Sequence, residues 1–476
     1  MRRTFARIAL FVCLSLTTTV ASNLFADPAA PTLSVPPAAK TPAVEALPAA
    51  SPAVDQKVGD PNAVKPPEAK AEVAVPGSVT ALQLELGKTD TSSFTLSGRD
   101  ARQQLVVTGV LASGALRDVT HHVKYEVSPS GIVTIGKGGL VTPVSEGTAT
   151  VSITHPSGKT VLTQVHVNQI VQDVPVNFPN QVVPVFTKFA CNSGGCHGKA
   201  SGQNGFRLSL LGFEPTEDFE HLVKEARGRR LFPAAPDRSL LLQKAAGTVP
   251  HGGGARIEVD SAPYRILRRW IEQGMPYGNA TDPVVTRVEL FPRERTLGRN
   301  GEQQLVCIAY YSDGQTRDVT SMTQFEPNDP EMATVSETGL VKSNEMTGMV
   351  AIMARYQGQV SVFRGIMPMG IVVDNLPPTK NLIDEHVFAQ LKTLGLPPSQ
   401  LCDDATYIRR VSIDITGRLP TAAESEKFVA DTNPNKREQL VDSLLASSAY
   451  ADYFVGKSRA ILRNKRHTEA HAHGSF

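Results

Sequence analysis

The sequence predicts a multidomain protein in which two all-β sandwiches flank a mostly α-helical domain, and a second α-helical domain follows. Three observations support this prediction. Several short motifs recur after 200 residues, and two cysteines with a histidine lie between the two copies. After Pro377 the apolar residues take up helical spacing.

The composition narrows the range of functions. A chain of 476 residues is long enough for three or four domains. Its 48 basic and 46 acidic residues nearly cancel, so no basic field indicates a nucleic-acid partner. Five cysteines in a chain of this length exclude a disulfide-rich scaffold. We find no nucleophile–base pair, carboxylate dyad or phosphate loop, so the sequence favours a carrier or binding protein over an enzyme.

The N-terminal segment is typical of an exported protein. Residues 1–26 read as a signal peptide, with an arginine-rich start, a short apolar run over Ile8–Leu16 and a small residue, Ala26, for cleavage. Residues 27–77 are rich in Ala and Pro and predict a disordered linker. No other apolar run is long enough for a transmembrane helix. We therefore expect a protein of the periplasm or the cell surface.

An internal repeat defines the two β modules, over residues 78–170 and 283–372. Short alternating apolar and polar runs, separated by Gly-containing turns, predict a β-sandwich in each. The motifs share one offset of 200 residues and need no gap between them. They are Gln103–Val106 with Gln303–Val306, Gly114 with Gly314, Arg117–Thr120 with Arg317–Thr320, and Gly139–Val141 with Gly339–Val341.

These modules resemble the bacterial Ig-like group 2 family. Asp313-Gly314, Arg317–Thr320 and Gly339–Val341 carry the resemblance. It implies an Ig-like spacer or adhesive module, and it brings no catalytic residue with it. We interpret Cys307, on a predicted strand of the second module, as a buried small apolar residue.

The segment between the modules, residues 176–280, contains a candidate haem-attachment motif. Cys191 and Cys196 could form thioethers to the haem vinyl groups, and the imidazole of His197 could bind the iron. The usual motif has two residues between the cysteines, whereas this chain has four. The alternative is a structural disulfide between Cys191 and Cys196 with His197 as a bystander.

The residues after this motif resemble the planctomycete-type cytochrome c domain. Pro236–Leu241 and the terminal helix with Trp270 to Pro276 match that family well. The family commonly places a methionine in its ligand loop, where this chain has His251. The resemblance implies covalent haem c, with His197 as the proximal ligand, His251 as the distal candidate and Met275 as the alternative. A turn histidine in a flexible Gly loop is the other interpretation of His251.

A haem of this kind implies transfer of single electrons to an unidentified redox partner. Arg207, Arg229 and Arg230 are candidates to pair with haem propionates, although exposed cations more often do nothing specific. A helix over Ala262–Gln273 should be capped by Asp260 or Ser261 and should bury Tyr264, Leu267, Trp270 and Ile271.

The last region, residues 378–476, predicts an α-helical bundle. Its helices should start near Leu382, Asp404, Thr421 and Lys436, and Thr421 and Glu424 should form a capping box. It looks like the helical domain of unknown function that accompanies planctomycete cytochrome domains. The match is carried by Asn381–Asp384, Cys402–Thr406, Arg409–Val411, Asp414–Gly417 and Leu419–Thr421. That family continues well beyond this point, which would make this copy a truncated one.

Other polar residues of this region have structural interpretations. Asp403, Asp404 and Asp414 suit helix caps and surface charges better than a carboxylate pair, and Cys402 suits a structural role. The terminal histidines suit a polar tail better than a metal site; they are His467, His471 and His473. The second functional hypothesis is a non-haem envelope interaction protein. Its Ig-like modules would bind an envelope protein or polysaccharide.

Overall fold

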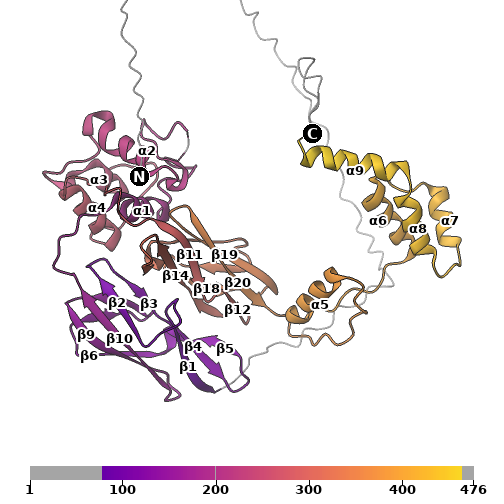
Figure 1. Cartoon of the computed structure of the whole chain (residues 1–476), viewed down its shortest axis with the longest axis horizontal. Coiled ribbons are helices and arrows are strands. Elements are labelled where there is room, and N and C mark those ends of the chain that lie inside the picture. Colours follow the sequence, from indigo (N-terminus) through magenta and orange to yellow (C-terminus); the bar gives the residue numbers. More distant parts are fainter. Residues whose placement is uncertain (1–77, 199, 464–476) are drawn as a thin grey trace, which may run out of the picture. The chain divides into compact units, whose positions relative to one another are not determined.

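The computed structural model describes residues 78–198 and 200–463, all of which belong to one unit of the chain, residues 69–476. The predicted signal peptide, the linker and the three terminal histidines lie outside the described residues. Figure 1 shows two groups of strands, a group of short helices and a C-terminal run of helices. We call residues 78–170 module 1, residues 283–372 module 2 and residues 176–280 the insertion.

Module 1 is an all-β sandwich. Its sheets have the orders β1-β4-β5, β2-β10-β9-β6 and β3-β8-β7, and β2 pairs with β10 in parallel. Alternate residues of the strands, such as Val141, Val151 and Ile153, are fully buried and form the core. The strands are β1 (Val79–Glu85), β2 (Ser93–Ser97), β3 (Gln103–Gln104), β4 (Val106–Leu111), β5 (Leu116–Asp118), β6 (Lys124–Ser128), β7 (Val133–Ile135), β8 (Leu140–Pro143), β9 (Gly147–Thr154) and β10 (Thr160–Asn168).

Module 2 repeats this topology strand for strand, with the sheet orders β11-β14-β15, β12-β20-β19-β16 and β13-β18-β17. The prediction of two all-β sandwiches is therefore confirmed. Cys307 is fully buried in the core, as expected, and burial raises the pKa of its thiol to about 12. The strands are β11 (Val285–Phe291), β12 (Glu294–Thr296), β13 (Glu302–Gln304), β14 (Val306–Tyr311), β15 (Thr316–Asp318), β16 (Gln324–Pro327), β17 (Ala333–Val335), β18 (Leu340–Ser343), β19 (Gly348–Tyr356) and β20 (Gln359–Met367).

The insertion consists of short helices around one apolar core. Trp270 and Phe178 are fully buried at its centre, with ring centroids 5.3 Å apart. The four expected apolar residues of α4 are all buried, and Ser261, rather than Asp260, caps the helix by accepting a hydrogen bond from the Tyr264 N–H. The helices are η2 (Phe178–Val182), α1 (Val183–Lys188), α2 (Pro215–Phe219), α3 (Leu240–Ala245) and α4 (Ala262–Glu272), with short helical turns between them.

The two ends of the insertion lie next to each other. The Phe178 N–H donates to the Tyr277 carbonyl at 3.0 Å, and Asn177 Nδ2 donates to Asp282 Oδ2 at 2.7 Å. The chain therefore enters and leaves this helical region at one place.

The C-terminal helices are α5 (Leu382–Leu394), α6 (Asp404–Thr416), α7 (Ala422–Ala430), α8 (Lys436–Leu445) and α9 (Ser448–Ile461). The capping box of Thr421 and Glu424 is present at α7. Helices α7, α8 and α9 each pack against α6, and α9 was not predicted. Helix α5 has no buried residue, and its Leu394 carbonyl accepts from the Met369 N–H, after β20.

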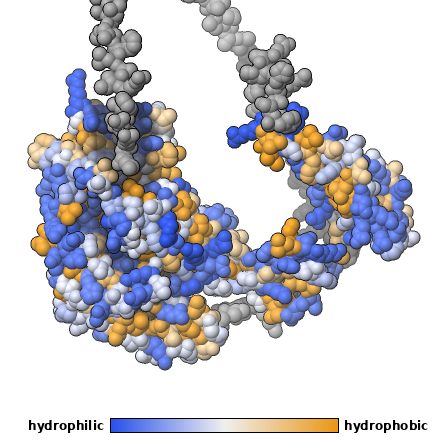
Figure 2. All heavy atoms as spheres, viewed as in Figure 1, coloured by the Kyte–Doolittle hydropathy of each residue, from blue (hydrophilic) through white to orange (hydrophobic). Residues whose placement is uncertain are grey.

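Apolar side chains of these helices remain on the surface. Leu382 and Ile383 of α5 and Ile461 of α9 are 66%, 70% and 80% exposed. Figure 2 shows hydrophobic residues on the visible face of α9. Among the described residues, no helix is both long enough and apolar enough to cross a membrane.

Candidate haem site

The two cysteines stand at either end of a compact turn that comes directly after α1. The His197 N–H donates to the Cys191 carbonyl at 3.0 Å, and the Cys196 N–H donates to the Ser193 carbonyl at 3.0 Å. Gly198 closes the turn, because a Cβ atom there would lie 1.9 Å from the Asn192 carbonyl oxygen. The four-residue spacing thus folds into a closed loop that presents Cys191, Cys196 and His197 together.

Both thiols are free, so the disulfide alternative is not realised in this structure. Cys191 is half-buried and packs against the core of the insertion. Burial, with a smaller effect of the neighbouring Cys196, raises the pKa of the Cys191 thiol to about 11. Cys191 is therefore held as a protonated thiol at neutral pH.

His197 is oriented by the segment after the glycine-rich stretch. Its Nδ1 lies 2.9 Å from the Phe206 carbonyl oxygen, and its ring centroid lies 4.6 Å from that of Phe206. A carbonyl oxygen can only accept, so Nδ1 carries the proton and the neutral ring keeps a lone pair on Nε2. Burial, which outweighs the opposing hydrogen bond to Phe206, lowers the pKa of His197. These contacts favour the neutral imidazole that metal binding needs.

His251 is held in the same way by its own loop. Its Nδ1 lies 2.9 Å from the Gly254 carbonyl oxygen. Gly254 adopts a φ of +72°, which only glycine adopts readily and which turns its carbonyl back toward the histidine. The glycines after His251 thus shape a turn that leaves Nε2 as the free nitrogen.

The structure brings the two predicted ligands together. The ring centroids of His197 and His251 are 6.3 Å apart, and the ring planes are within 7° of parallel. An imidazole nitrogen binds a transition metal at about 2.0–2.1 Å and lies about 1 Å from its ring centre, so two imidazoles that bind one ion have centres within roughly 6.5 Å of each other. The separation and the two anchored Nδ1 atoms make His197 and His251 the side chains that could bind one haem iron here.

Met275, the alternative ligand, occupies a different environment. Its backbone has a φ of +60°, its N–H donates to the Trp270 carbonyl at 2.9 Å, and its side chain packs against the apolar core. It is His251, therefore, that lies beside His197. Within the described residues, no three His, Cys, Asp or Glu side chains lie close enough to share a single ion.

The three arginines have unequal environments. Arg230 is buried, donates to the Gly205 carbonyl at 2.7 Å and places its guanidinium 4.7 Å from the centre of the Phe206 ring. Arg229 and Arg207 are exposed, although Arg207 Nε donates to His221 Nε2 at 2.9 Å. Arg230 therefore supports the turn whose carbonyl anchors His197. The sequence alone suggested an exposed cation with no specific role.

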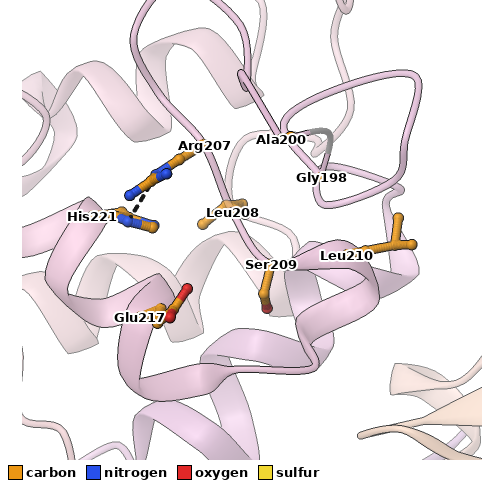
Figure 3. Close-up of a pocket in the computed structure, with 8 residues that line it drawn as sticks. All are labelled: Gly198, Ala200, Arg207, Leu208, Ser209, Leu210, Glu217 and His221. Carbon is orange, nitrogen blue, oxygen red and sulfur yellow. Dashed lines mark hydrogen bonds between the residues drawn. The ribbon is translucent and has the colours of Figure 1, made fainter. Parts of the chain in front are cut away.

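His221, a buried histidine beside Arg207, was not predicted as a functional residue. Its Nδ1 is buried and has no hydrogen-bond partner among the described residues. A cavity of about 200 Å³ borders this pair, and Figure 3 shows Arg207 reaching toward His221 with Ser209 and Glu217 on the same cavity. The sequence signal was weak because a single histidine in a polar helical segment has no motif around it.

The acidic residues of the C-terminal helices have structural roles, as interpreted. Asp403 Oδ1 accepts from the Thr406 N–H at 2.7 Å and caps α6. Asp404 forms ion pairs with Lys436 and Arg437, both at 2.7 Å, and Asp414 is exposed.

Comparison with known proteins supports only part of this picture. Residues 382–475 match the family model PSCyt2, described as a protein of unknown function (DUF1549). No curated protein matches the chain. The match covers less than half of the chain, so it describes the C-terminal helices alone.

Several solved structures show a weak likeness. Domains 5–6 of the S-layer protein SbsC are 10% identical over 60% of this chain and 99% of that chain, with a TM-score of 0.23. The intimin fragment bound to the intimin-binding domain of the translocated intimin receptor is 11% identical over 76% and 83%, with a TM-score of 0.14. The longer SbsC chain of domains 1–6 is 11% identical over 64% of this chain, with a TM-score of 0.16.

This chain covers 29% of the length of that longer SbsC chain. At these identities and TM-scores the likenesses carry no argument about function. The C-terminal helices are thus similar to a family whose own function is unknown, and the chemistry of the chain has to be argued from its residues.

Proposed function

We propose that this protein is an exported c-type-cytochrome-like carrier that binds haem c in the insertion and passes single electrons in the cell envelope. The observation that carries the proposal is the pairing of His197 with His251 at 6.3 Å, each with Nδ1 anchored to a carbonyl. Free thiols at Cys191 and Cys196 lie on the same loop as His197. The resemblance to the planctomycete-type cytochrome c domain supports the same assignment.

Each residue has a defined task in this proposal. Cys191 and Cys196 would hold the haem through thioethers, and His197 and His251 would bind its iron. Bound haem supplies a one-electron couple whose potential two histidines set lower than a histidine–methionine pair would. The Nδ1 hydrogen bonds hold both rings in one tautomer and orientation, which leaves Nε2 of each ring to bind a metal.

The location in the envelope rests on the sequence. The predicted signal peptide supports export, and covalent haem attachment normally takes place outside the cytoplasm. The two sandwich modules support a role at the periphery of the cell, as spacers or adhesive domains around the carrier.

Haem staining on a denaturing gel tests the proposal. The full chain is produced in a host with c-type maturation machinery, beside a Cys191→Ala/Cys196→Ala variant. We expect a stained band that the variant loses, because covalent haem survives denaturation. An unstained wild-type band contradicts the proposal.

The axial assignment has its own test. His251→Ala should keep the covalent haem but change its absorption spectrum toward a high-spin form, because one strong-field ligand is lost. His386→Ala, an exposed histidine of α5, is the matched control and should leave the spectrum unchanged. A His251→Ala spectrum identical to wild type removes His251 from the ligand set.

The second candidate function is a non-haem envelope interaction protein that binds a protein or polysaccharide through its sandwich modules. It rests on the resemblance of these modules to adhesive Ig-like domains, and it assigns Cys191 and Cys196 to a structural disulfide. Alkylation of the secreted protein before and after reduction distinguishes the two. Thiols that become reactive only after reduction, in a protein without haem stain, support the interaction protein.

A further inference from the structure

The repeated motifs of the two modules have a shared use that the sandwich fold does not explain. Asp118, in the Arg-Asp-Val-Thr motif of module 1, is buried. Its Oδ2 accepts from the Gln304 N–H at 2.7 Å and from Gln303 Nε2 at 2.9 Å. Both donors belong to the Gln-Gln motif of module 2.

The same contact is made in the reverse direction. Asp318 of module 2 accepts from the Gln104 N–H and, at 3.2 Å, from Gln103 Nε2 of module 1. Residue i of one copy meets residue j of the other, and j meets i. This exchange is the signature of a two-fold, isologous interface, here between two copies within a single chain.

An apolar patch separate from the two module cores completes the interface. Val106 of module 1 and Val306 of module 2 are fully buried and Ile308 is nearly so, and Phe291 and Tyr310 pack against them. At the edge, Glu85 of module 1 pairs with Arg295 of module 2. A buried apolar patch with hydrogen-bonded carboxylates around it is the composition of a specific interface.

The interface also distinguishes one module from the other. Ile308 fills a notch at Gly87, where a Cβ atom would lie 2.1 Å from Ile308 Cγ1. Seven residues, Gly87 among them, connect β1 to β2 in module 1, whereas only two residues, Pro292 and Arg293, connect β11 to β12 in module 2. Module 2 paired with itself would set Ile308 against this shorter connection, and module 1 paired with itself would offer Thr108 to the notch in place of Ile308. The shapes therefore favour a pair of unlike modules.

We propose that this face is a dedicated pairing surface, that its partner is the other sandwich module of the same chain, and that the two modules act as one unit rather than as independent spacers. The proposal does not depend on haem. It assigns the Gln-Gln and Arg-Asp-Val-Thr repeats to recognition between modules, with the Ile308 knob and the Gly87 notch as the residues that set specificity.

Hydrogen exchange of the full chain at single-residue resolution tests the pairing directly. The Gln104 and Gln304 amides donate to carboxylates of the opposite module, whereas the neighbouring Leu105 and Leu305 amides donate to Gly139 and Gly339 of their own module. We expect all four amides to be protected. Protection of Leu105 and Leu305 together with free exchange at Gln104 and Gln304 would overturn the proposal.

The Asp118→Asn variant tests whether the carboxylate of Asp118 protects the Gln304 amide from exchange. In Asp118→Asn the side-chain oxygen can still accept from the Thr120 N–H of its own turn, but its amide group meets the N–H of Gln304. We expect protection at Gln304 to fall by about tenfold or more while Leu305 is unchanged. Asp313→Asn, an exposed turn residue of module 2, should change neither. Equal protection of Gln304 in Asp118→Asn and wild type contradicts the pairing.

Two further readouts test the partner and the notch. Protection at Gln104 and Gln304 should not depend on protein concentration, since the partner is in the same chain. Loss of protection on dilution would place the partner in a second copy and overturn this part of the proposal. Ile308→Thr, which copies Thr108 of module 1, should lower protection at both glutamines, and unchanged protection would remove the knob and notch as a source of specificity.

Discussion

At the scale of single residues, the two carboxyl groups buried between the modules, Asp118 and Asp318, make the stability of the protein depend on pH. Burial raises the pKa of Asp118 and of Asp318 from 3.8 to about 6 against the opposing hydrogen bonds. His121 and Tyr125 lie near Asp118, and Cys307 lies near Asp318. The folded state thus holds these two protons more tightly than the unfolded chain does.

The sign of the resulting pH dependence is set by this difference. The stability from the two protonated carboxyls is fully present below about pH 3.8 and is lost as pH rises through 6. We expect each to contribute a change on the order of 2–3 kcal/mol in the free energy of unfolding. Thermal unfolding between pH 4 and 7 measures it, and Asp118→Asn/Asp318→Asn should lack this part of the slope. A double variant with the wild-type slope would show that these carboxyls keep ordinary pKa values.

Trp270 offers a second prediction at this scale. It is fully buried, it packs against Phe178, and its Nε1 donates to the Pro276 carbonyl at 2.9 Å. Trp270→Ala should destabilise the insertion by about 3–5 kcal/mol because it leaves a cavity and an unpaired carbonyl. Urea unfolding followed by circular dichroism measures the loss, and Trp270→Phe should cost less. Equal stability of wild type and Trp270→Ala would show that the insertion does not depend on this core.

The residues of the candidate haem site could be predicted from the sequence, because haem attachment needs cysteines and histidines together. Two cysteines, an adjacent histidine and a second histidine among glycines predicted a ligand set, and the structure brings His197 and His251 together. Whether haem occupies the site stays a prediction. The roles of Asp118 and Arg230 could not be read from the sequence, because each depends on a partner far away in the chain or on a packing environment.

At the scale of helices and strands, short sequence patterns were enough to predict where individual helices begin. The apolar face and Ser cap of α4 and the capping box of α7 are short-range patterns, and both helices begin within a residue of the prediction. Helix α5 shows the limit of such signals. Its apolar spacing predicted the helix correctly, but spacing alone does not say what covers the apolar face.

The cap of α7 gives the third prediction. Thr421 Oγ1 accepts from the Glu424 N–H at 3.2 Å, and Glu424 Oε2 accepts from the Thr421 N–H at 2.7 Å. Thr421→Ala should destabilise the C-terminal helices by about 1 kcal/mol, whereas Thr421→Ser keeps the hydroxyl and should be nearly neutral. Denaturant unfolding of the two variants tests this, and equal stability of both would show that the cap adds nothing.

At the scale of the whole molecule, the repeat predicted two similar sandwiches but not their pairing. Sequence identity at a fixed offset shows that two copies exist, while a pairing face is visible only once both copies are folded. The repeated Gln-Gln and Arg-Asp-Val-Thr motifs therefore belong both to the fold of each module and to the interface between the modules. Only their part in the fold could be predicted from the sequence.

The junction of the insertion gives the fourth prediction. Asp282 Oδ2 accepts from Asn177 Nδ2 and from the Asn279 N–H, both at 2.7 Å. Asp282→Ala should loosen the point where the insertion meets module 2 and lower the exchange protection of Gln104 and Gln304. Asp313→Ala, an exposed control, should not. Unchanged protection in Asp282→Ala would mean that module pairing does not depend on how the junction is held.

The adjacent ends of the insertion determine how often the two modules meet. When the insertion is folded, the modules are joined by a short bridge; when it is unfolded, a flexible loop of roughly a hundred residues separates them, and closing a loop costs more entropy as it lengthens. Folding of the insertion therefore raises the effective concentration of each module at the other. Anything that stabilises the insertion, a covalently attached cofactor included, should therefore also strengthen the contact between the two β-sandwiches.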